Sequence, residues 1–124
     1  PLFLGATSKA ILANMSSRQQ SQLFLENPDE VRASHLGQTW EQFRRSLQQL
    51  RRQGYVASAA EIDPGVYGLA APIFDNDGKV VGSISCLRPI QERDNAQEAQ
   101  QGAQMQALAQ ALSQRMATLT HRPG

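Results

Sequence analysis

The alternation of apolar and polar positions is clearest between residues 54 and 89, where it predicts strands joined by tight turns. Residues 66–74 are apolar and mostly β-compatible, and residues 79–87 form a second extended run. Asp75-Asn76-Asp77-Gly78 lies between them as a turn signal, so the two runs predict an antiparallel hairpin. A shorter extended segment at residues 55–60 precedes them. The stretch therefore predicts three strands.

Small residues occur in this hairpin where a purely structural one would carry bulk. Side chains alternate between the two faces of a strand, so Ser83, Ser85 and Leu87 share one face and Cys86 lies on the other. Gly68 is a further small position, on the first strand of the hairpin. Two interpretations stay open. The serine face is either solvated, as one face of an antiparallel sheet often is, or the floor of a small-molecule pocket.

Pro72 lies within the first strand of the hairpin. Proline has no N–H to donate to a strand ladder, so we expect an edge or a bulge there.

The clearest helix begins after Thr39. Thr39 and Gln42 fit a capping box, in which each side chain satisfies the other residue's backbone N–H. Gly54 is expected to end the helix as its C-terminal glycine. The apolar stripe recurs at spacings of 3, 4 and 3 and comprises Trp40, Phe43, Leu47 and Leu50. The arginines lie largely off this stripe and are expected on a solvated face: Arg44, Arg45, Arg51 and Arg52.

Helical spacing also occurs at both ends of the chain. Residues 6–15 predict one helix, and Ser16 or Ser17 can cap a second. Residues 26–38 are expected to be a connector that can include a helical turn. Residues 96–119 predict a long final helix whose stripe is core or a subunit contact. That stripe comprises Met105, Leu108, Leu112, Met116 and Leu119. Helices around three strands give an α+β layer architecture.

Composition removes several classes of function. The 124 residues fit one domain, with 12 basic and 11 acidic side chains and a net charge of +1. The chain thus lacks the basic footprint of an autonomous nucleic-acid binder, and 6% aromatic residues are too few for a base-stacking platform. No apolar run approaches the ~18 residues of a membrane span, and no secretory signal is visible. We expect a cytoplasmic domain without membrane contact.

The cysteine and histidines carry no metal-binding pattern. Cys86 is the single cysteine, which excludes an intrachain disulfide and a multi-cysteine zinc site. We expect it to be a small apolar residue packed against a helix. His35 and His121 fall in a connector and a tail, without partners at ligand spacing. The sequence therefore predicts no metal and no cofactor.

Two blocks of residues resemble the effector-binding domain of IclR-type bacterial transcription regulators. The first consists of Pro1-Leu2 followed by Lys9-Ala10-Ile11-Leu12-Ala13. The second consists of Arg52-Gln53-Gly54-Tyr55, Glu61, Gly65, Leu69-Ala70-Ala71-Pro72-Ile73-Phe74-Asp75, Gly78, Val80-Val81 and Pro89. The second block is long and nearly gapless, and the resemblance covers almost the whole chain.

The resemblance implies a GAF-like, profilin-like fold, which is a curved antiparallel sheet with flanking helices. It implies a small effector, carboxylated or aromatic, in the concave face, and a homodimer or tetramer. Residues 1–124 would be most of one such domain, truncated on its amino-terminal side. DNA would be contacted only through an upstream winged helix-turn-helix domain that this chain lacks.

The resemblance also implies six effector-binding positions. Two offer backbone N–H groups at a helix amino terminus, which favours an anion. The others supply hydroxyl groups, apolar contact or space. They are Ala6, Thr7, Ser58, Gly68, Ser85 and Leu87. Ser58 stands where the family more often has an acid, and Leu87-Arg88 replaces Ser-Gly, so the pocket is expected to be less polar at Leu87 or to gain a cation at its rim.

Two other functions remain as alternatives. An enzyme on the same scaffold, such as a hydrolase of small acids, would need a nucleophile with a base. Glu61 and Asp63 flank a turn with neither nearby in the sequence, so we interpret them as structural and predict no catalytic residue. The second alternative is a dimerisation module with a vestigial pocket, which the departures at Ser58 and Leu87 favour.

Overall fold

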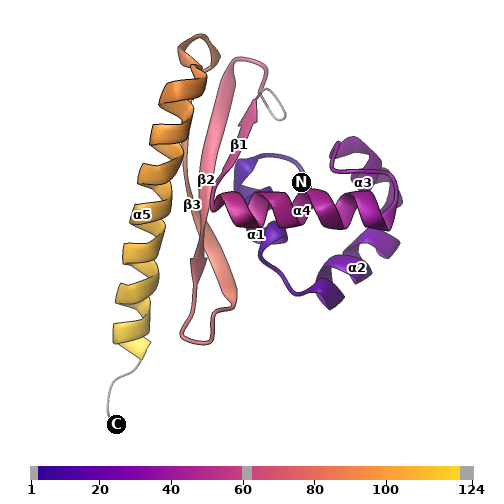
Figure 1. Cartoon of the computed structure of the whole chain (residues 1–124), viewed down its shortest axis with the longest axis horizontal. Coiled ribbons are helices and arrows are strands. Elements are labelled where there is room, and N and C mark those ends of the chain that lie inside the picture. The colour runs from indigo at the N-terminus through magenta and orange to yellow at the C-terminus, as the bar shows by residue number, and fades with distance from the viewer. Residues whose placement is uncertain (1–2, 60–62, 121–124) are drawn as a thin grey trace.

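The computed structural model describes residues 3–59 and 63–120, with the side chains of residues 119 and 120 excepted, and shows three layers (Figure 1). A long helix covers one face of a small sheet, and the other helices lie on the opposite face. This arrangement has the predicted α+β class. The elements in chain order are α1 (Ala6–Ala13), α2 (Ser17–Glu26), α3 (Pro28–Ala33), α4 (Trp40–Gln53), β1 (Val56–Ala59), β2 (Val66–Phe74), β3 (Val80–Pro89), a 3-10 turn (Ile90–Glu92) and α5 (Asn95–Thr120).

The sheet has the order β1-β2-β3, and both pairings are antiparallel, as the sequence predicts. The turn between β2 and β3 is held by the side chain of Asp75. Its carboxylate accepts hydrogen bonds from the backbone N–H groups of Asp77 and Lys79, both at 2.9 Å. Gly78 takes a positive φ of 77°, a conformation that glycine adopts at little steric cost. Local turn chemistry therefore fixes the hairpin.

Pro72 occupies a position where one side of β2 has no ladder partner. The described part of β1 ends its pairing with Val56 opposite Ala70, two residues before the proline. A register shift follows at Ile73 and Phe74. Pro72 therefore has both features expected near a strand proline. Its β1 side is an unpaired edge, and the pairing with β3 becomes irregular just after it.

One face of the sheet packs against α5. Tyr67, Leu69 and Ala71 form a buried cluster with Met105 and Ala109. Only part of the predicted stripe of this helix lies in that cluster. Leu108 is 48% exposed, because the buried face follows the narrower series of Gly102, Met105 and Ala109 rather than every large apolar residue.

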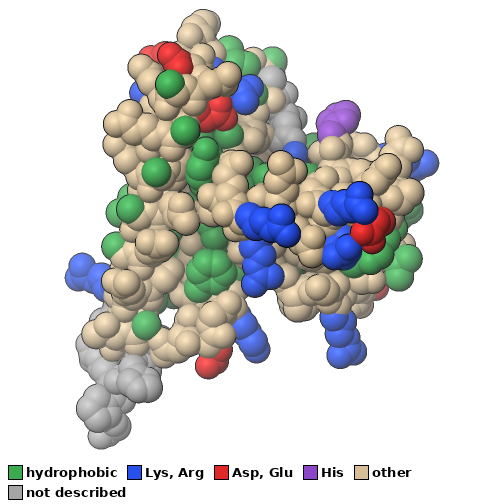
Figure 2. Space-filling view, viewed as in Figure 1, with side chains coloured by type: hydrophobic (Ala, Val, Ile, Leu, Met, Phe, Trp, Pro, Cys, Tyr) green, Lys and Arg blue, Asp and Glu red, His purple; other side chains and the backbone are tan. Residues whose placement is uncertain are grey.

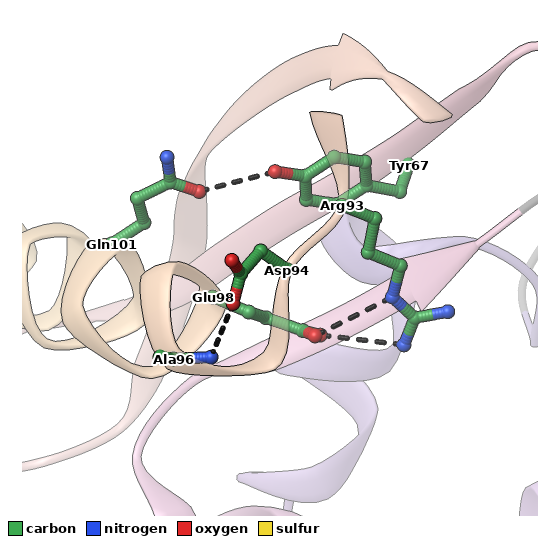
Figure 3. Close-up of polar contacts among 6 residues, drawn as sticks. All are labelled: Tyr67, Arg93, Asp94, Ala96, Glu98 and Gln101. Carbon is green, nitrogen blue, oxygen red and sulfur yellow. Dashed lines mark hydrogen bonds and ion pairs between the residues drawn. The ribbon is translucent and has the colours of Figure 1, made fainter. Parts of the chain in front are cut away.

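Polar contacts stabilise the first turns of α5, and one of them joins the helix to the sheet (Figure 3). The carboxylate of Asp94 accepts the backbone N–H of Ala96 at 2.9 Å, which caps the helix. Arg93 pairs with Glu98 at 3.4 Å. The hydroxyl of the buried Tyr67 donates to the side-chain oxygen of Gln101 at 3.2 Å. The polar group of this core side chain therefore has a hydrogen-bond partner.

A second core lies among the first four helices. Its fully buried members include Phe3, Leu12, Phe43 and Leu47, and the ring of Phe24 packs edge-on or tilted against neighbouring aromatic rings. The predicted stripe of α4 is therefore confirmed as its buried face.

The helix ends follow the predicted chemistry. Capping boxes join Ser16 with Gln19 and Thr39 with Gln42, and Gly54 ends α4 in the left-handed conformation. The connector expected at residues 26–38 contains the short helix α3, which begins with Pro28 at its first position, where proline is well tolerated.

Basic side chains gather over α4 on one face of the molecule (Figure 2). Glu41 pairs with Arg44 at 2.6 Å and with Arg45 at 3.4 Å. The hydrogen bond from Arg44 lowers the pKa of the Glu41 carboxyl below its ordinary value. Arg51 and Arg52 are exposed, as predicted for a solvated helix face.

Gly102 gives a first testable prediction. A Cβ at this position would overlap the ring of Tyr55. Alanine favours a helix interior by roughly 1 kcal/mol over glycine, yet overpacking costs about 1–3 kcal/mol. We therefore expect Gly102→Ala to lower the free energy of unfolding, measured by urea denaturation.

A double variant checks the cause of that loss. With Tyr55→Ala in the background, the second substitution at Gly102 should cost nothing or stabilise, because the overlapping ring is gone. An equal loss in both backgrounds would contradict the steric explanation.

Candidate functional site

The face of the sheet opposite α5 is crossed by α1. Alternation along the strands places Ser83, Ser85 and Leu87 on this face, while Ile84 and Cys86 lie in the cluster against α5. The predicted division of the two faces is confirmed. Cys86 is half-buried, consistent with a small apolar packing residue.

A hollow of about 110 Å³ opens between the start of α1 and this face. The six positions that the sequence predicts as effector-binding all line it, although they come from four separate segments of the chain. They are Ala6, Thr7, Ser58, Gly68, Ser85 and Leu87. Their shared location follows from the fold, whereas a binding role for them remains a prediction.

Strand register builds the floor of the hollow. Ser58, Gly68 and Leu87 lie side by side across the three strands, and Ser85 faces Ala70 two pairs further along. A Cβ at Gly68 would lie 3.4 Å from both the Ala6 side chain and the Leu87 side chain. The glycine therefore keeps open the space between the helix and the sheet.

The amino terminus of α1 forms the rim. Its N-cap residue is Gly5, with a φ of 87°, no side chain caps the helix, and its first turn contains no acidic residue. The first N–H groups of any helix have no partner within the helix, and the helix dipole adds partial positive charge there. Gly5, Ala6, Thr7 and Ser8 line the hollow, so this end of it favours an anion.

Ser83 joins the helix to the sheet beside the hollow. Its hydroxyl donates to the backbone carbonyl of Thr7 at 3.4 Å. Ser83 shares the face of Ser85 but does not line the hollow. The two serines thus have different positions, which sequence alternation alone could not separate.

Asp63 also lines the hollow, which the sequence interpretation missed. Its turn role is as predicted, because a carboxylate oxygen accepts the Gly65 N–H at 2.8 Å. The signal that could have identified it is its place in the loop joining β1 and β2, the strands that carry Ser58 and Gly68. Glu61, its proposed structural companion, lies outside the described residues.

Other kinds of site find no support in the described parts of the chain. No group of three His, Cys, Asp or Glu side chains there could hold a metal ion. No described helix has both the length and the apolar character to cross a bilayer. His35 has a positive φ of 60° in its connector, and His121 lies beyond the described residues.

Comparison with known proteins identifies the kind of domain. The model of the bacterial transcriptional regulator IclR C-terminal family matches residues 1–114. A C-terminal domain of a putative transcriptional regulator from Vibrio cholerae is 29% identical, with a TM-score of 0.70, and the match covers 90% of this chain and 63% of that one. The comparison with curated proteins gave no significant match.

Two further solved structures share the fold at lower identity. The repressor BlcR of Agobacterium tumefaciens is 23% identical, with a TM-score of 0.79, and the match covers 94% of this chain and 48% of BlcR. The C-terminal domain of the E. coli regulator KdgR is 24% identical, with a TM-score of 0.78, and the match covers 94% of this chain and 71% of that domain. This chain thus spans about half to seven tenths of the structures that it matches.

The regulator family and the α+β fold inferred from sequence are both confirmed by these matches. The family consists of transcriptional regulators rather than enzymes. Because the family model covers all but the last ten residues, this chain belongs to the IclR C-terminal family of bacterial transcriptional regulators.

Proposed function

We propose that the chain is the effector-binding part of a transcription regulator, and that a small carboxylated effector binds in the hollow beneath α1. The observation that supports this most directly is that residues from separate segments of the chain line one hollow. Ala6 and Ser85 are far apart in sequence but line one hollow, together with Ser58 and Gly68. The family assignment makes an effector the natural occupant.

The anionic end of the effector would lie at the start of α1. No lysine, arginine or histidine is among the described lining residues, so the backbone N–H groups at Ala6 and Thr7 would supply the positive potential. A helix amino terminus stabilises a nearby negative charge by roughly 0.3–1 kcal/mol at exposed sites and up to about 2 kcal/mol when partly buried. Direct N–H hydrogen bonds to a carboxylate would add to this.

The floor would orient the rest of the molecule. The hydroxyls of Ser58 and Ser85 can donate or accept hydrogen bonds, and Val66 and Leu87 provide apolar contact. A hollow of about 110 Å³ without an aromatic side chain among its described lining residues favours a compact aliphatic acid over an aromatic one.

Regulation would follow from differential affinity. An effector that binds one arrangement of the oligomer more tightly than another shifts the population toward it. We propose a homodimer or tetramer, with DNA bound through a winged helix-turn-helix domain upstream of this chain. The match covers 48% of BlcR, so about half of that repressor lies outside the matched region. A full-length regulator of similar size would be long enough to include such a domain.

A dimerisation module with a vestigial pocket is the second candidate. The exposure of Leu87, at 72%, favours it, because a ligand-binding floor usually encloses most of its ligand. The two candidates differ in whether any small acid binds to the folded protein.

Gly68→Ala should weaken effector binding without unfolding the domain. The new methyl group would make ordinary contacts with its neighbours at 3.4 Å while taking up space between α1 and the floor of the hollow. A thermal-shift screen of small carboxylic acids measures this, because binding to the folded state adds RT ln(1 + [L]/Kd), about 2.7 kcal/mol at a hundredfold excess over Kd. The matched control is Gly82→Ala, where a Cβ meets nothing within 4 Å. Equal shifts in the two variants would place the ligand elsewhere.

Ser85→Ala should weaken binding of the best acid from that screen about three- to tenfold, the usual worth of one neutral hydrogen bond. Titration calorimetry gives the affinity, and the melting temperature without ligand should be unchanged because Ser85 is exposed. Ser17→Ala, an exposed serine of α2 outside the hollow, should bind as the parent does. Parental affinity in Ser85→Ala would remove this residue from the site.

A further inference from the structure

One residue that lines the hollow carries a carboxylate, which a simple anion site would not include. Of its described lining residues, Asp63 is the only one with an ionisable side chain. The start of α1 contributes partial positive charge to the same small space. A hollow of about 110 Å³ is therefore lined both by the partly positive start of α1 and by an acidic residue.

A plain carboxylic acid would be favoured by only one of these two groups. Its carboxylate would gain from the helix amino terminus but would be repelled by the carboxylate of Asp63, since like charges at short range interact unfavourably. A ligand that also carries a hydrogen-bond donor would satisfy both groups. Its donor would face Asp63 while its carboxylate faced α1.

The turn that follows holds Asp63 in place. One carboxylate oxygen accepts the N–H of Gly65 at 2.8 Å, and the backbone carbonyl of Asp63 accepts the N–H of Val66 at 3.3 Å. Val66 also lines the hollow, so the turn ends directly at the floor. An ionised carboxylate has acceptor capacity on both oxygens, and one backbone hydrogen bond leaves capacity for a ligand.

We propose that the effector is a small aliphatic acid that also carries a hydroxyl or ammonium group, and that Asp63 selects it through this donor. This inference rests on the proposed effector site and narrows its ligand. Hydrogen bonds to an ionised acceptor are about twice as strong as neutral ones, so the preference should be about tenfold or more in Kd.

Matched three-carbon acids test the proposal in the full protein. Propionate is the plain acid, lactate and 3-hydroxypropionate carry a hydroxyl group, and alanine and β-alanine carry an ammonium group. Titration calorimetry at constant pH and ionic strength gives each affinity. Binding of at least one hydroxy or amino acid should exceed that of propionate by about tenfold, and the two sets show which donor is preferred.

Asp63→Asn identifies the residue responsible. Asparagine keeps an oxygen that can accept the Gly65 N–H, so the turn should persist while the charge is lost. We expect this variant to lose the preference for the donor-bearing acid and to bind propionate as well as, or better than, the parent. Asp77→Asn is the matched control, because Asp77 is an exposed acid in the β2–β3 turn outside this hollow and its loss changes net charge equally.

The outcomes distinguish selection by Asp63 from the existence of the effector site. A preference that Asp63→Asn removes and Asp77→Asn retains supports selection by Asp63. Propionate binding as tightly as every substituted acid, or a preference that survives in Asp63→Asn, overturns it while leaving the proposed effector site intact. No binding of any acid, in a protein whose folding is verified by circular dichroism, overturns the proposed site and this inference with it.

Discussion

The close approach of α1 to the sheet is the constraint on which the site depends. The contact is made by small side chains, with Ala6 and Ala10 on the helix against Val56 and Ala70 on the strands, all at most 6% exposed. Larger residues there would raise the helix from the sheet, because packed interiors accommodate added volume poorly. Because these side chains are small, the amino terminus of α1 lies close to Gly68. The hollow is thus a product of backbone proximity.

The two faces of the sheet contribute unequally to the buried cores. The face against α5 carries the bulk, with Tyr67 and Leu69 at most 1% exposed, and a separate helical core surrounds Phe43 and Leu47. Apolar burial of this kind is the main favourable contribution to folding. Because those two cores supply it, the opposite face of the sheet is free to carry glycine and serine where a single-core domain would need larger apolar residues.

Local patterns in the sequence predicted what local chemistry determines. Capping residues such as Ser16 and Thr39 mark helix starts through their own hydrogen bonds, and strand alternation assigned the faces of the hairpin. Tertiary contacts determined the rest. Leu108 follows the apolar stripe of α5, yet it is exposed because the buried face of this helix runs through Met105 and Ala109. Asp63 reads as a turn residue, and only the folded loop shows that it also reaches the hollow.

A site made of backbone and small side chains has a consequence for specificity. The N–H groups at α1 and the space at Gly68 are fixed by packing, so in the proposed site they would accept small acids in general. Selection among acids would then depend on the few side chains at the margin, including Ser58, Asp63 and Leu87. These residues are half-buried or exposed, and surface substitutions usually change stability by no more than about 0.5 kcal/mol. Such a domain can change its ligand while its cores stay intact, which is consistent with a fold shared at 23–29% identity.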